Sequence, residues 1–478
     1  MKTDSYLAID LGATSGRTVL ATFDGTRIQM REFTRFDNPQ ITLGGHIFWD
    51  LPYLYNQIIK ALCQAKAEDV ELTSIGIDTW GCDIVPFGQD GQLLGLPYCY
   101  RDPHTDGAVE RFCADRLSRQ ELYQRTGIQF MPFNTLFQLD TLQRSGCVAM
   151  RHASQLLFIP DALVFLLTGQ AVCEYTVAST SQMLNAQTCD FDPDILSALG
   201  LSRKQFGRMV FPGEQVGVLT PQVQAATGLG AIPVIAVGSH DTASAVASVP
   251  ALDSSYAYLS CGTWSLLGIE SPRPIITPES YSSNFTNEGG LDGSIRFLKN
   301  ITGLWLFEQC RREWASASSP CVPEDVNALN ALCLTSRCQS LIAPDDPAFA
   351  HPASMTAAIR EHLRQTNQPL PQTPADYIRV IFRSLAARYR EVVDTLRAIA
   401  PVDIQRLHVI GGGSRNEFLM QFAADALQMP VIAGPQEGTA LGNAAVQLRA
   451  SGQVRTLPQL RQIICQSIDL KTYQPNNL

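Results

Sequence analysis

Residues 6–20 read Tyr-Leu-Ala-Ile-Asp-Leu-Gly-Ala-Thr-Ser-Gly-Arg-Thr-Val-Leu. Two apolar runs, residues 6–9 and 18–21, flank a turn that is rich in small and polar residues. This pattern predicts a β-hairpin with a polar, glycine-containing tip. We expect the hairpin to open the fold, and the rest of the chain is best understood from it.

The tip of this hairpin has the chemistry of a phosphate site. Gly12 and Gly16 let backbone N–H groups face an anion without a Cβ in the way. Asp10, at the end of the first strand, could hold a phosphate-bound Mg²⁺ directly or through its waters. Two hydroxyl donors and one cation complete the tip: Thr14, Ser15 and Arg17. The alternative is an ordinary hairpin with a polar turn.

Length and composition limit the possible functions. The chain has 478 residues, too many for a single core, so we expect two domains of similar size. Hydrophobic residues make up 45% and charged residues 17%, which is a globular composition. The net charge of −9 argues against a general role on nucleic acids or membranes, although a local basic pocket stays possible.

The sequence also predicts a compartment. The first residues lack the apolar run of a signal peptide, and no stretch of about 18 apolar residues occurs elsewhere. The 13 cysteines are scattered without a C-x-x-C pair, which indicates reduced core thiols rather than a disulfide or zinc framework. We therefore expect a cytoplasmic protein.

A polar stretch follows a predicted strand at residues 72–77. It reads Asp78-Thr79-Trp80-Gly81-Cys82-Asp83 and lies at the kind of strand end where open α/β sheets bind ligands. Residues 100–102 and 130–134 also mix aromatic and polar side chains. A sugar needs hydrogen-bonding groups beside an apolar wall. We interpret six of these residues as a sugar site: Trp80, Asp83, Arg101, Asp102, Phe133 and Asn134. The alternative is that each residue has only a structural role.

Residues 232–249 predict an apolar strand, a turn and a helix. The turn reads Gly238-Ser239-His240-Asp241-Thr242 and places Asp241 near the helix N-terminus. Asp241 could be a general base at the strand end, with His240 or Thr242 orienting it or the substrate. The alternative is that Asp241 only caps the helix.

Residues 255–269 repeat the pattern of the first hairpin. An apolar strand is followed by the turn Cys261-Gly262-Thr263-Trp264 and by a second apolar strand. This echo is the best evidence in the sequence for a duplicated fold. A nucleotide would then lie between two related domains whose boundary falls near residues 248–253, so we expect domains at residues 1–248 and 249–478.

Two glycine-rich turns near the C-terminus each join a predicted strand to a helix. The first is Gly411-Gly412-Gly413-Ser414-Arg415-Asn416, and the second spans residues 434–442. Bare backbone lets a flat ligand lie close, and a helix N-terminus favours negative charge. We interpret the pair as an adenosine pocket, although one glycine-rich turn alone is weak evidence.

Several nucleotide and catalytic motifs are absent from the sequence. There is no G-x-x-x-x-G-K-[ST] run, no protein-kinase motif set and no G-x-G-x-x-G after the first strand. A G-x-S-x-G nucleophile elbow and a zinc-ligand spacing are also missing. These absences exclude a P-loop and disfavour a dinucleotide dehydrogenase.

Four of these motifs together resemble those of the FGGY carbohydrate kinases: residues 10–17, 238–242, 260–264 and 411–416. Residues 76–81, 100–102, 128–136 and 299–305 resemble one subfamily of sugar kinases rather than the fold alone. The resemblance covers nearly the whole chain. It implies an α/β fold of two duplicated actin-like (ribonuclease H-like) ATPase domains with a cleft between them.

The same resemblance implies an activity and the residues for it. The γ-phosphoryl group of Mg·ATP would pass to the O1 hydroxyl of L-rhamnulose, with Asp241 as proton acceptor and Asp10 at the metal. ATP phosphates would contact Ala13, Thr14, Ser15, Gly16, Arg17 and Thr263, and the adenosine would contact Gly411, Gly412 and Gly413. The sugar would contact Gly81, His240, Asp241, Thr242 and Asn300.

Two alternatives and two departures from the family pattern remain. The alternatives are a related ketose kinase, such as L-fuculokinase or xylulokinase, and a nucleotide-dependent binding or filament protein on the actin-like fold. Ala13 stands where many members have threonine, so a phosphate contact must come from Thr14 or Ser15. Glu308 stands where we expect glutamine, and we leave it out of the nucleotide site because a carboxylate repels phosphates. We expect ATP and a small sugar as partners, no nucleic acid or membrane, and a monomer or homodimer.

Overall fold

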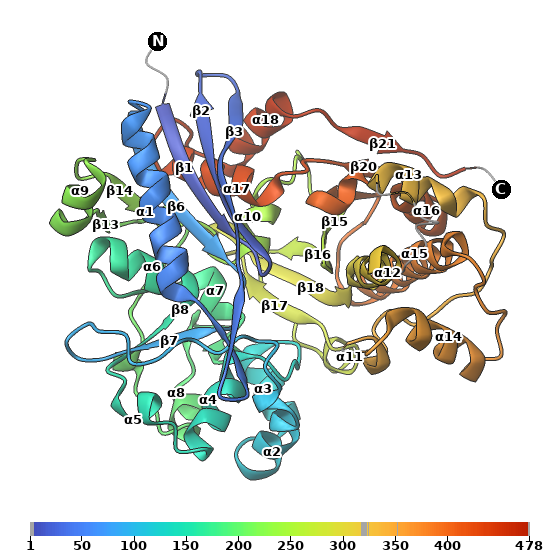
Figure 1. Ribbon diagram of the computed structural model, residues 1–478, viewed down its shortest axis with the longest axis horizontal. Coiled ribbons are helices and arrows are strands. Elements are labelled where there is room, and N and C mark those ends of the chain that lie inside the picture. Colours follow the sequence, from blue (N-terminus) through green and yellow to red (C-terminus); the bar gives the residue numbers. More distant parts are fainter. Residues whose placement is uncertain (1–3, 317–322, 324, 351, 477–478) are drawn as a thin grey trace. The chain divides into compact units, whose positions relative to one another are not determined.

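The structure is a computed structural model that describes residues 4–316, 323, 325–350 and 352–476 (Figure 1). The chain divides into two compact units. Unit 1 comprises the chain up to Leu252 together with Glu270–Phe297 and Gly438–Ser467. Unit 2 comprises Asp253–Ile269, Leu298–Glu437 and the chain from Ile468 onward.

The first sheet lies in unit 1 and has six strands in the order β13-β14-β6-β1-β2-β3. The strands are β1 (Asp4–Leu11), β2 (Ser15–Phe23), β3 (Ile28–Asp37), β6 (Leu72–Thr79), β13 (Gln215–Val218) and β14 (Pro233–Ile235). β1 pairs antiparallel with β2 and parallel with β6, which pairs parallel with β14. The predicted hairpin is therefore present, and the carboxyl ends of β1, β6 and β14 share one edge of the sheet.

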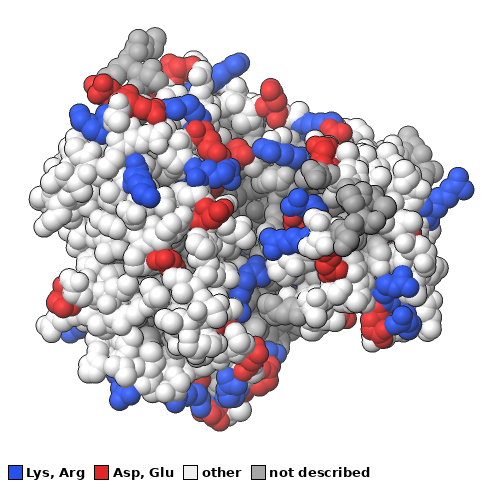
Figure 2. Space-filling view, in the orientation of Figure 1, with Lys and Arg blue, Asp and Glu red and all other residues white. Residues whose placement is uncertain are grey.

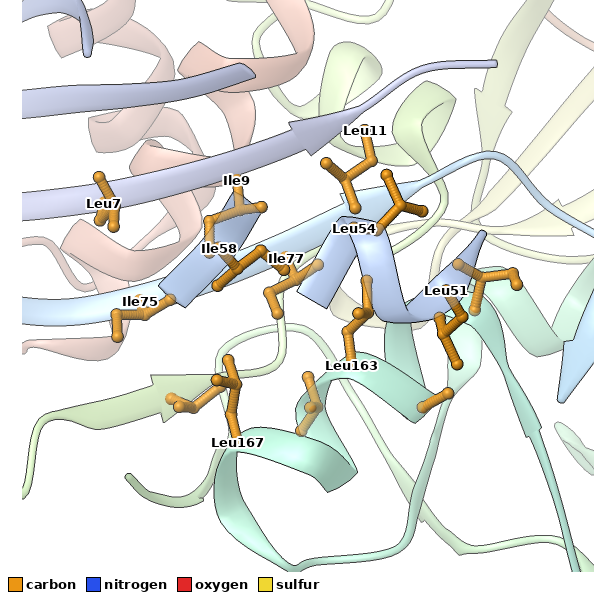
Figure 3. Close-up of a cluster of buried hydrophobic side chains, with 14 of the residues drawn as sticks. Leu7, Ile9, Leu11, Leu51, Leu54, Ile58, Ile75, Ile77, Leu163 and Leu167 are labelled. Carbon is orange, nitrogen blue, oxygen red and sulfur yellow. The ribbon is translucent and has the colours of Figure 1, made fainter. Parts of the chain in front are cut away.

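Helices cover this sheet: α1 (Leu51–Ala67), α6 (Ile159–Thr168), α10 (Asp241–Ala247) and α17 (Gly438–Ala450). Leu7, Ile9 and Leu11 of β1 share an apolar cluster with α1 and α6 (Figure 3). Ala8 clusters with Ala440 of α17 instead. Because successive side chains of a strand point to opposite faces, β1 contributes to two separate apolar layers.

Shorter elements complete unit 1. Paired short strands are β4 (Gln40–Leu43) with β5 (His46–Trp49), β7 (Ile84–Phe87) with β8 (Gln155–Phe158), β9 (Val172–Glu174) with β12 (Arg208–Val210), and β10 (Leu184–Asn185) with β11 (Asp190–Phe191). The remaining helices are α2 (Ala108–Asp115), α3 (Arg119–Thr126), α4 (Thr135–Arg144), α5 (Val148–His152), α7 (Tyr175–Ser179), α8 (Pro193–Ala198), α9 (Pro221–Thr227), α11 (Pro278–Ser282), α18 (Leu457–Ser467) and the 3-10 turns η1 (Pro103–Thr105), η2 (Arg203–Gln205) and η3 (Leu291–Gly293).

The second sheet has seven strands in the order β17-β18-β16-β15-β19-β20-β21. The strands are β15 (Tyr256–Cys261), β16 (Trp264–Ser271), β17 (Thr286–Gly289), β18 (Ile295–Thr302), β19 (Arg406–Ile410), β20 (Val431–Ala433) and β21 (Lys471–Tyr473). β15 pairs antiparallel with β16 and parallel with β19. The same pairing pattern surrounds β1, so the two predicted hairpins also match in topology.

Unit 2 contains the helices α12 (Trp305–Ser316), α13 (Val326–Ala331), α14 (Met355–Gln365), α15 (Pro374–Ile399), α16 (Glu417–Leu427) and the 3-10 turns η4 (Leu332–Leu334), η5 (Pro347–Phe349) and η6 (Gly412–Arg415). The helix α15 has 26 residues, and Thr373 caps it in a capping box with Asp376. Its Tyr389 hydroxyl lies 2.8 Å from the Ser265 hydroxyl of β16 and so ties the helix to the sheet.

None of the helices within the described ranges combines the length and apolar character needed to cross a lipid bilayer. On the face drawn in Figure 2, Lys and Arg side chains are interspersed with Asp and Glu side chains. The cysteines in the described part of the chain are all free thiols.

The α1 cluster gives a first prediction. Ile58 of α1 is fully buried against the first sheet, whereas Asn56 on the same helix is exposed. Ile58→Ala should weaken unit 1 by about 2–5 kcal/mol because it leaves a cavity, and Asn56→Ala should change stability by less than about 0.5 kcal/mol. Hydrogen exchange of peptides from β1 and β6 measures both. Equal exchange in the two variants would contradict the packing described here.

Candidate functional site

The tip of the β1–β2 hairpin is held by its neighbours. The Gly12 N–H donates to the Ser15 carbonyl at 2.9 Å, and Asn38 donates to the carbonyls of Gly12 and Thr14 at 2.9 and 3.0 Å. Gly16 is required by packing, because a Cβ there would lie 2.4 Å from the Phe36 ring. Neither Gly12 nor Gly16 adopts a left-handed conformation. The tip is thus a fixed turn, with Thr14 exposed.

Asp10 and Arg17 form an ion pair inside this hairpin. They are partners in the β1–β2 register, and the Arg17 Nε and Nη2 donate to Asp10 Oδ2 at 2.9 and 2.7 Å. Both side chains are mostly buried: Arg17 is 17% exposed and Asp10 is 11% exposed. The predicted phosphate cation and the predicted metal carboxylate therefore neutralise each other in this structure.

Asp78 lies beside Asp10 on the neighbouring strand β6. It is fully buried, and Asn443 of α17 donates to its Oδ2 at 2.5 Å. Burial, and after it the charge of Asp10, raise the pKa of Asp78 well above its usual range, and the Asn443 hydrogen bond only partly opposes this. Of the two neighbouring carboxyls, Asp78 is therefore the one whose surroundings favour the neutral form, whereas Asp10 is paired with Arg17.

Asp241 is the first residue of α10, and His240 precedes the helix. Its carboxylate does not cap the helix. Instead, the Thr242 hydroxyl donates to Asp241 Oδ1 at 3.1 Å, and the His240 Nε2 lies 3.5 Å from the same oxygen. The Asp241 side chain is 33% exposed, so it can meet a ligand. The capping alternative is therefore wrong, and the position suits a general base.

The backbone of this turn is anchored by a buried glutamate that the sequence analysis missed. The Ser239 N–H donates to Glu174 Oε2 at 3.2 Å, and the His240 N–H donates to the Thr176 hydroxyl at 3.2 Å. That hydroxyl donates in turn to Glu174 at 2.6 Å. Burial raises the pKa of Glu174 to about 7, against the hydrogen bonds from Thr176, Val177 and Ser239 that lower it. A lone acid in the apolar run at residues 171–175 was the available signal.

The turn also meets the end of β6. The Thr79 N–H donates to the Ser239 carbonyl at 2.9 Å, and Thr79 forms a parallel bridge with His240. Because β6 also pairs with β1, the hairpin tip, the Asp78 carboxyl and the Asp241 turn lie along the same sheet edge. This edge is where open α/β sheets bind ligands.

Asp83 organises the aromatic group predicted to hold sugar. Its carboxylate accepts hydrogen bonds from the Trp49 and Trp80 indoles at 2.6 and 2.9 Å. The Tyr100 N–H and the Gln138 amide donate to it at 3.1 and 2.8 Å. Burial raises the pKa of Asp83 to about 7, against these hydrogen bonds. The four donors make Asp83 an anchor of the aromatic group, and its direct contact with sugar stays a prediction.

The other predicted sugar residues divide into separate groups. The Asp102 carboxylate accepts from the Ile47 N–H at 2.6 Å and lies 2.8 Å from the His104 Nδ1, so it ties β5 to η1. Asn134 donates to Gln182 at 2.9 Å. Gly81 leaves room for Thr180, whose hydroxyl would lie 2.9 Å from a Cβ at position 81. Asn300 lies on β18 in unit 2, and its contact with sugar remains a prediction.

The second hairpin tip, in unit 2, supports the start of α12. The Leu304 N–H donates to the Gly262 carbonyl at 2.9 Å, and the Trp305 N–H donates to the Thr263 carbonyl at 3.2 Å. Glu308, one turn into α12, is paired with Arg311 at 2.7 Å. The unexpected carboxylate at position 308 is therefore neutralised by its own helix.

The reason for a glycine differs at each of positions 411, 412 and 413. Gly411 is left-handed, with φ +87°, and its N–H donates to the Pro435 carbonyl at 3.0 Å. A Cβ at Gly413 would lie 2.3 Å from Cys261 Sγ. A Cβ at Gly412 would meet nothing within 4 Å. Backbone conformation explains the first glycine and packing explains the third, whereas the second leaves open backbone where a flat ligand could lie.

The two glycine-rich turns predicted as an adenosine pocket are joined. Besides the Gly411 hydrogen bond, Arg415 Nε donates to Gln436 Oε1 at 2.6 Å, and Arg415 Nη2 lies 3.2 Å from Glu437 Oε1. Within unit 2, the structure thus brings the first turn against residues 435–437 of the second, as the sequence analysis expects. Nucleotide binding there remains a prediction.

No metal-binding cluster is preformed in the part of the chain that the structure describes, since no three His, Cys, Asp or Glu side chains there are grouped as ligands. A magnesium ion would need ligands from elsewhere, and phosphate oxygens and water are its usual additional partners. Asp10 offers the type of oxygen ligand that Mg²⁺ prefers, so its place at the tip fits the expected metal.

Solved structures share this fold. A gluconate kinase from Lactobacillus acidophilus matches with a TM-score of 0.81 at 18% identity, covering 99% of this chain and 94% of that one. A glycerol kinase from Plasmodium falciparum, solved with ADP, matches with a TM-score of 0.79 at 14% identity, covering 99% and 95%. These likenesses confirm the predicted two-part α/β sugar-kinase fold.

Relatives and family models also match nearly the whole chain. A protein named rhamnulokinase from Bacteroides thetaiotaomicron is 52% identical over 99% of this chain and 96% of its own length. One of the same name from Pectobacterium carotovorum is 43% identical over 99% and 94%. The models of the N-terminal and C-terminal domains of the FGGY carbohydrate kinases match residues 5–247 and 257–451. The chain belongs to the FGGY family of carbohydrate kinases, and is thus a sugar kinase.

Proposed function

We propose that the protein transfers the γ-phosphoryl group of ATP to the O1 hydroxyl of L-rhamnulose. The choice of substrate rests on one observation: the chain is 52% and 43% identical, over almost its full length, to proteins named rhamnulokinase. The partly exposed Asp241 carboxylate at the carboxyl edge of the first sheet supports the chemistry. The free thiols of the described residues support a cytoplasmic location, and the proposed enzyme is a monomer or homodimer.

Each unit offers groups for one part of this reaction. In unit 1, the hairpin tip from Ala13 to Arg17 would bind phosphate oxygens through N–H, hydroxyl and guanidinium donors. In unit 2, Thr263 would add a phosphate contact, and the open backbone at Gly412, between Gly411 and Gly413, would bind the adenosine. Gly81, Asp83, His240, Thr242 and Asn300 would hold the sugar.

Asp10 would hold Mg²⁺, directly or through water. The ion pair with Arg17 favours the charged form of this carboxylate, whereas the surroundings of the neighbouring Asp78 favour its neutral form. When bound, the metal neutralises phosphate charge. Arg17 is already bonded to Asp10, so this ion pair would offer a guanidinium to the phosphate and a carboxylate to the metal.

Asp241 would act as the proton acceptor. A carboxylate is too weak a base to ionise a sugar hydroxyl in advance. In the loose transition state of phosphoryl transfer the proton leaves late, so Asp241 need only accept it as the new bond forms. Positioning and charge neutralisation supply the rest of the acceleration.

The first test is a ketose panel with ATP. Purified enzyme should give its highest kcat/KM with L-rhamnulose, and exceed L-fuculose and D-xylulose by at least about 10-fold, because the site must distinguish hydroxyl positions. A coupled assay of ADP release measures this. A better rate with another ketose would support one of the alternative ketose kinases. Slow ATP hydrolysis without stimulation by any sugar would support the filament or binding protein instead.

The second test removes the proton acceptor. Asp241→Asn should lower kcat by about 10²- to 10⁴-fold and leave ATP affinity unchanged, because the amide cannot take the proton. Asp194→Asn is a matched control, since Asp194 is also an acid in the first turn of a helix and pairs with Arg125 at 2.7 Å. Steady-state kinetics and ATP titration compare the two. Near-normal turnover of Asp241→Asn would reject the assigned base.

The third test blocks the open backbone at Gly412. Gly412→Val should raise the KM for ATP by about 10-fold or more while the KM for sugar stays unchanged, because the new side chain enters ligand space. Gly230→Val is the control, since a Cβ at Gly230 also meets nothing within 4 Å. A normal KM for ATP in Gly412→Val would move the adenosine away from this turn.

A further inference from the structure

A buried ion pair lies behind His240. Glu288 on β17 and Arg296 on β18 are 6% and 0% exposed, and their Oε2 and Nη2 atoms are 3.1 Å apart. Arg296 Nε donates to the Gly289 carbonyl at 2.8 Å. Pairs buried this deeply add little to stability, because desolvation offsets their attraction. The proposed mechanism does not use either residue, so the pair calls for another explanation.

The pair constrains the tautomer of the His240 ring. Arg296 Nη2 lies 3.1 Å from His240 Nδ1. A guanidinium can only donate, so Nδ1 must accept, and the proton of the neutral ring then sits on Nε2. Glu288 Oε2 lies 3.4 Å from the same Nδ1 and would favour a proton there, but the Arg296 contact is shorter. Arg296 therefore decides the tautomer, and Glu288 holds Arg296 in place.

This tautomer suits the other side of the ring. His240 Nε2 lies 3.5 Å from Asp241 Oδ1, and an Nε2–H there faces a carboxylate oxygen, whereas a bare nitrogen would repel it. Thr242 donates to the same oxygen at 3.1 Å. Among the described residues, both contacts of the Asp241 carboxylate thus involve Oδ1. Oδ2 is left as the oxygen that can take a proton from the sugar.

We propose that Glu288 and Arg296 are positioning residues that hold His240 in the Nε2–H form, so that Asp241 Oδ1 is occupied by donors and Oδ2 accepts the sugar proton. The proposal rests on the kinase function proposed above. It assigns the positioning to one buried charge pair rather than to His240 alone. It also predicts which replacement restores function, because any neutral donor to Nδ1 serves in place of Arg296.

Two double variants separate tautomer control from folding. Arg296→Met with Glu288→Leu removes both charges and, with Arg296, the donor that the structure places at Nδ1. Arg296→Met with Glu288→Gln also removes both charges, but its amide can donate to Nδ1. As a control, Arg461→Met with Glu270→Leu removes another buried ion pair of unit 1 that lies outside the proposed site.

The first readout is the ¹⁵N spectrum of the histidine rings in unliganded protein, with His240 identified by the signal lost in His240→Asn. Wild type and the Met/Gln variant should show the Nε2–H tautomer, and the Met/Leu variant should show a smaller fraction of it, because the Asp241 carboxylate then favours this form without a donor at Nδ1. A wild-type ring protonated on Nδ1, or on both nitrogens, overturns the proposal. This readout needs no substrate, so it stands even if the ketose panel rejects the proposed function.

The second readout is kinetic. The Met/Leu variant should lose about 10- to 100-fold in kcat, the usual cost of removing a group that orients a functional side chain, with the KM for ATP unchanged. The Met/Gln variant should recover most of the loss, and the Arg461→Met/Glu270→Leu control should keep wild-type kcat. Equal losses in the Met/Leu and Met/Gln variants, or a loss in the control, would show a structural role only and overturn the proposal.

Discussion

Negative charge gathers at the carboxyl edge of the first sheet, and each buried carboxylate there needs a donor of its own. Burying an ionised or polar group without a partner costs several kcal/mol. Asp10 has Arg17, Asp78 has Asn443, and Glu288 has Arg296. Glu174 takes its donors from the turn that carries Asp241. Two of them, Asp78 with Asn443 and Glu174 with the Ser239 N–H, join segments that are far apart in the chain.

The same constraint separates the reactive acid from the structural ones. Asp241 is the carboxylate of this group whose side chain keeps a third of its surface exposed. Its neighbours contribute donors to one oxygen and leave the other to a ligand. The edge therefore combines acids with raised pKa values, which serve as neutral or paired supports, with one acid that is free to react. Differences in environment assign the roles, as they do wherever carboxylates crowd together.

Local patterns in the sequence predict much of this architecture. The β1–β2 hairpin, its echo at β15–β16 and the capped helix α15 all follow from features a few residues apart. The turn at residues 238–242 was also recognisable, because a strand, small residues and a helix surround Asp241. The family motifs then supplied the fold class, and both the solved structures and the family models confirm it.

Partnerships between distant residues could not be predicted in this way. Glu174 lies 65 residues from the Ser239 N–H that it accepts, and Arg296 lies 56 residues from His240. The sequence signal for Glu174 and for Arg296 was a charged residue inside an apolar run, and this signal does not reveal which residue it contacts. Glycines were equally ambiguous: Gly16 and Gly413 make room for Phe36 and Cys261, whereas Gly412 leaves space open.

The threading of unit 1 has a consequence for synthesis. A nascent chain that has reached Leu252 carries every strand of the first sheet, yet α17, which packs on β1 and β6, comes nearly two hundred positions later. Domains of most proteins form as they leave the ribosome. In this protein, the apolar face of the sheet that α17 covers stays uncovered until synthesis of the chain is almost complete. The order of the segments therefore makes completion of this half of the fold a late event, at the end of translation or after it.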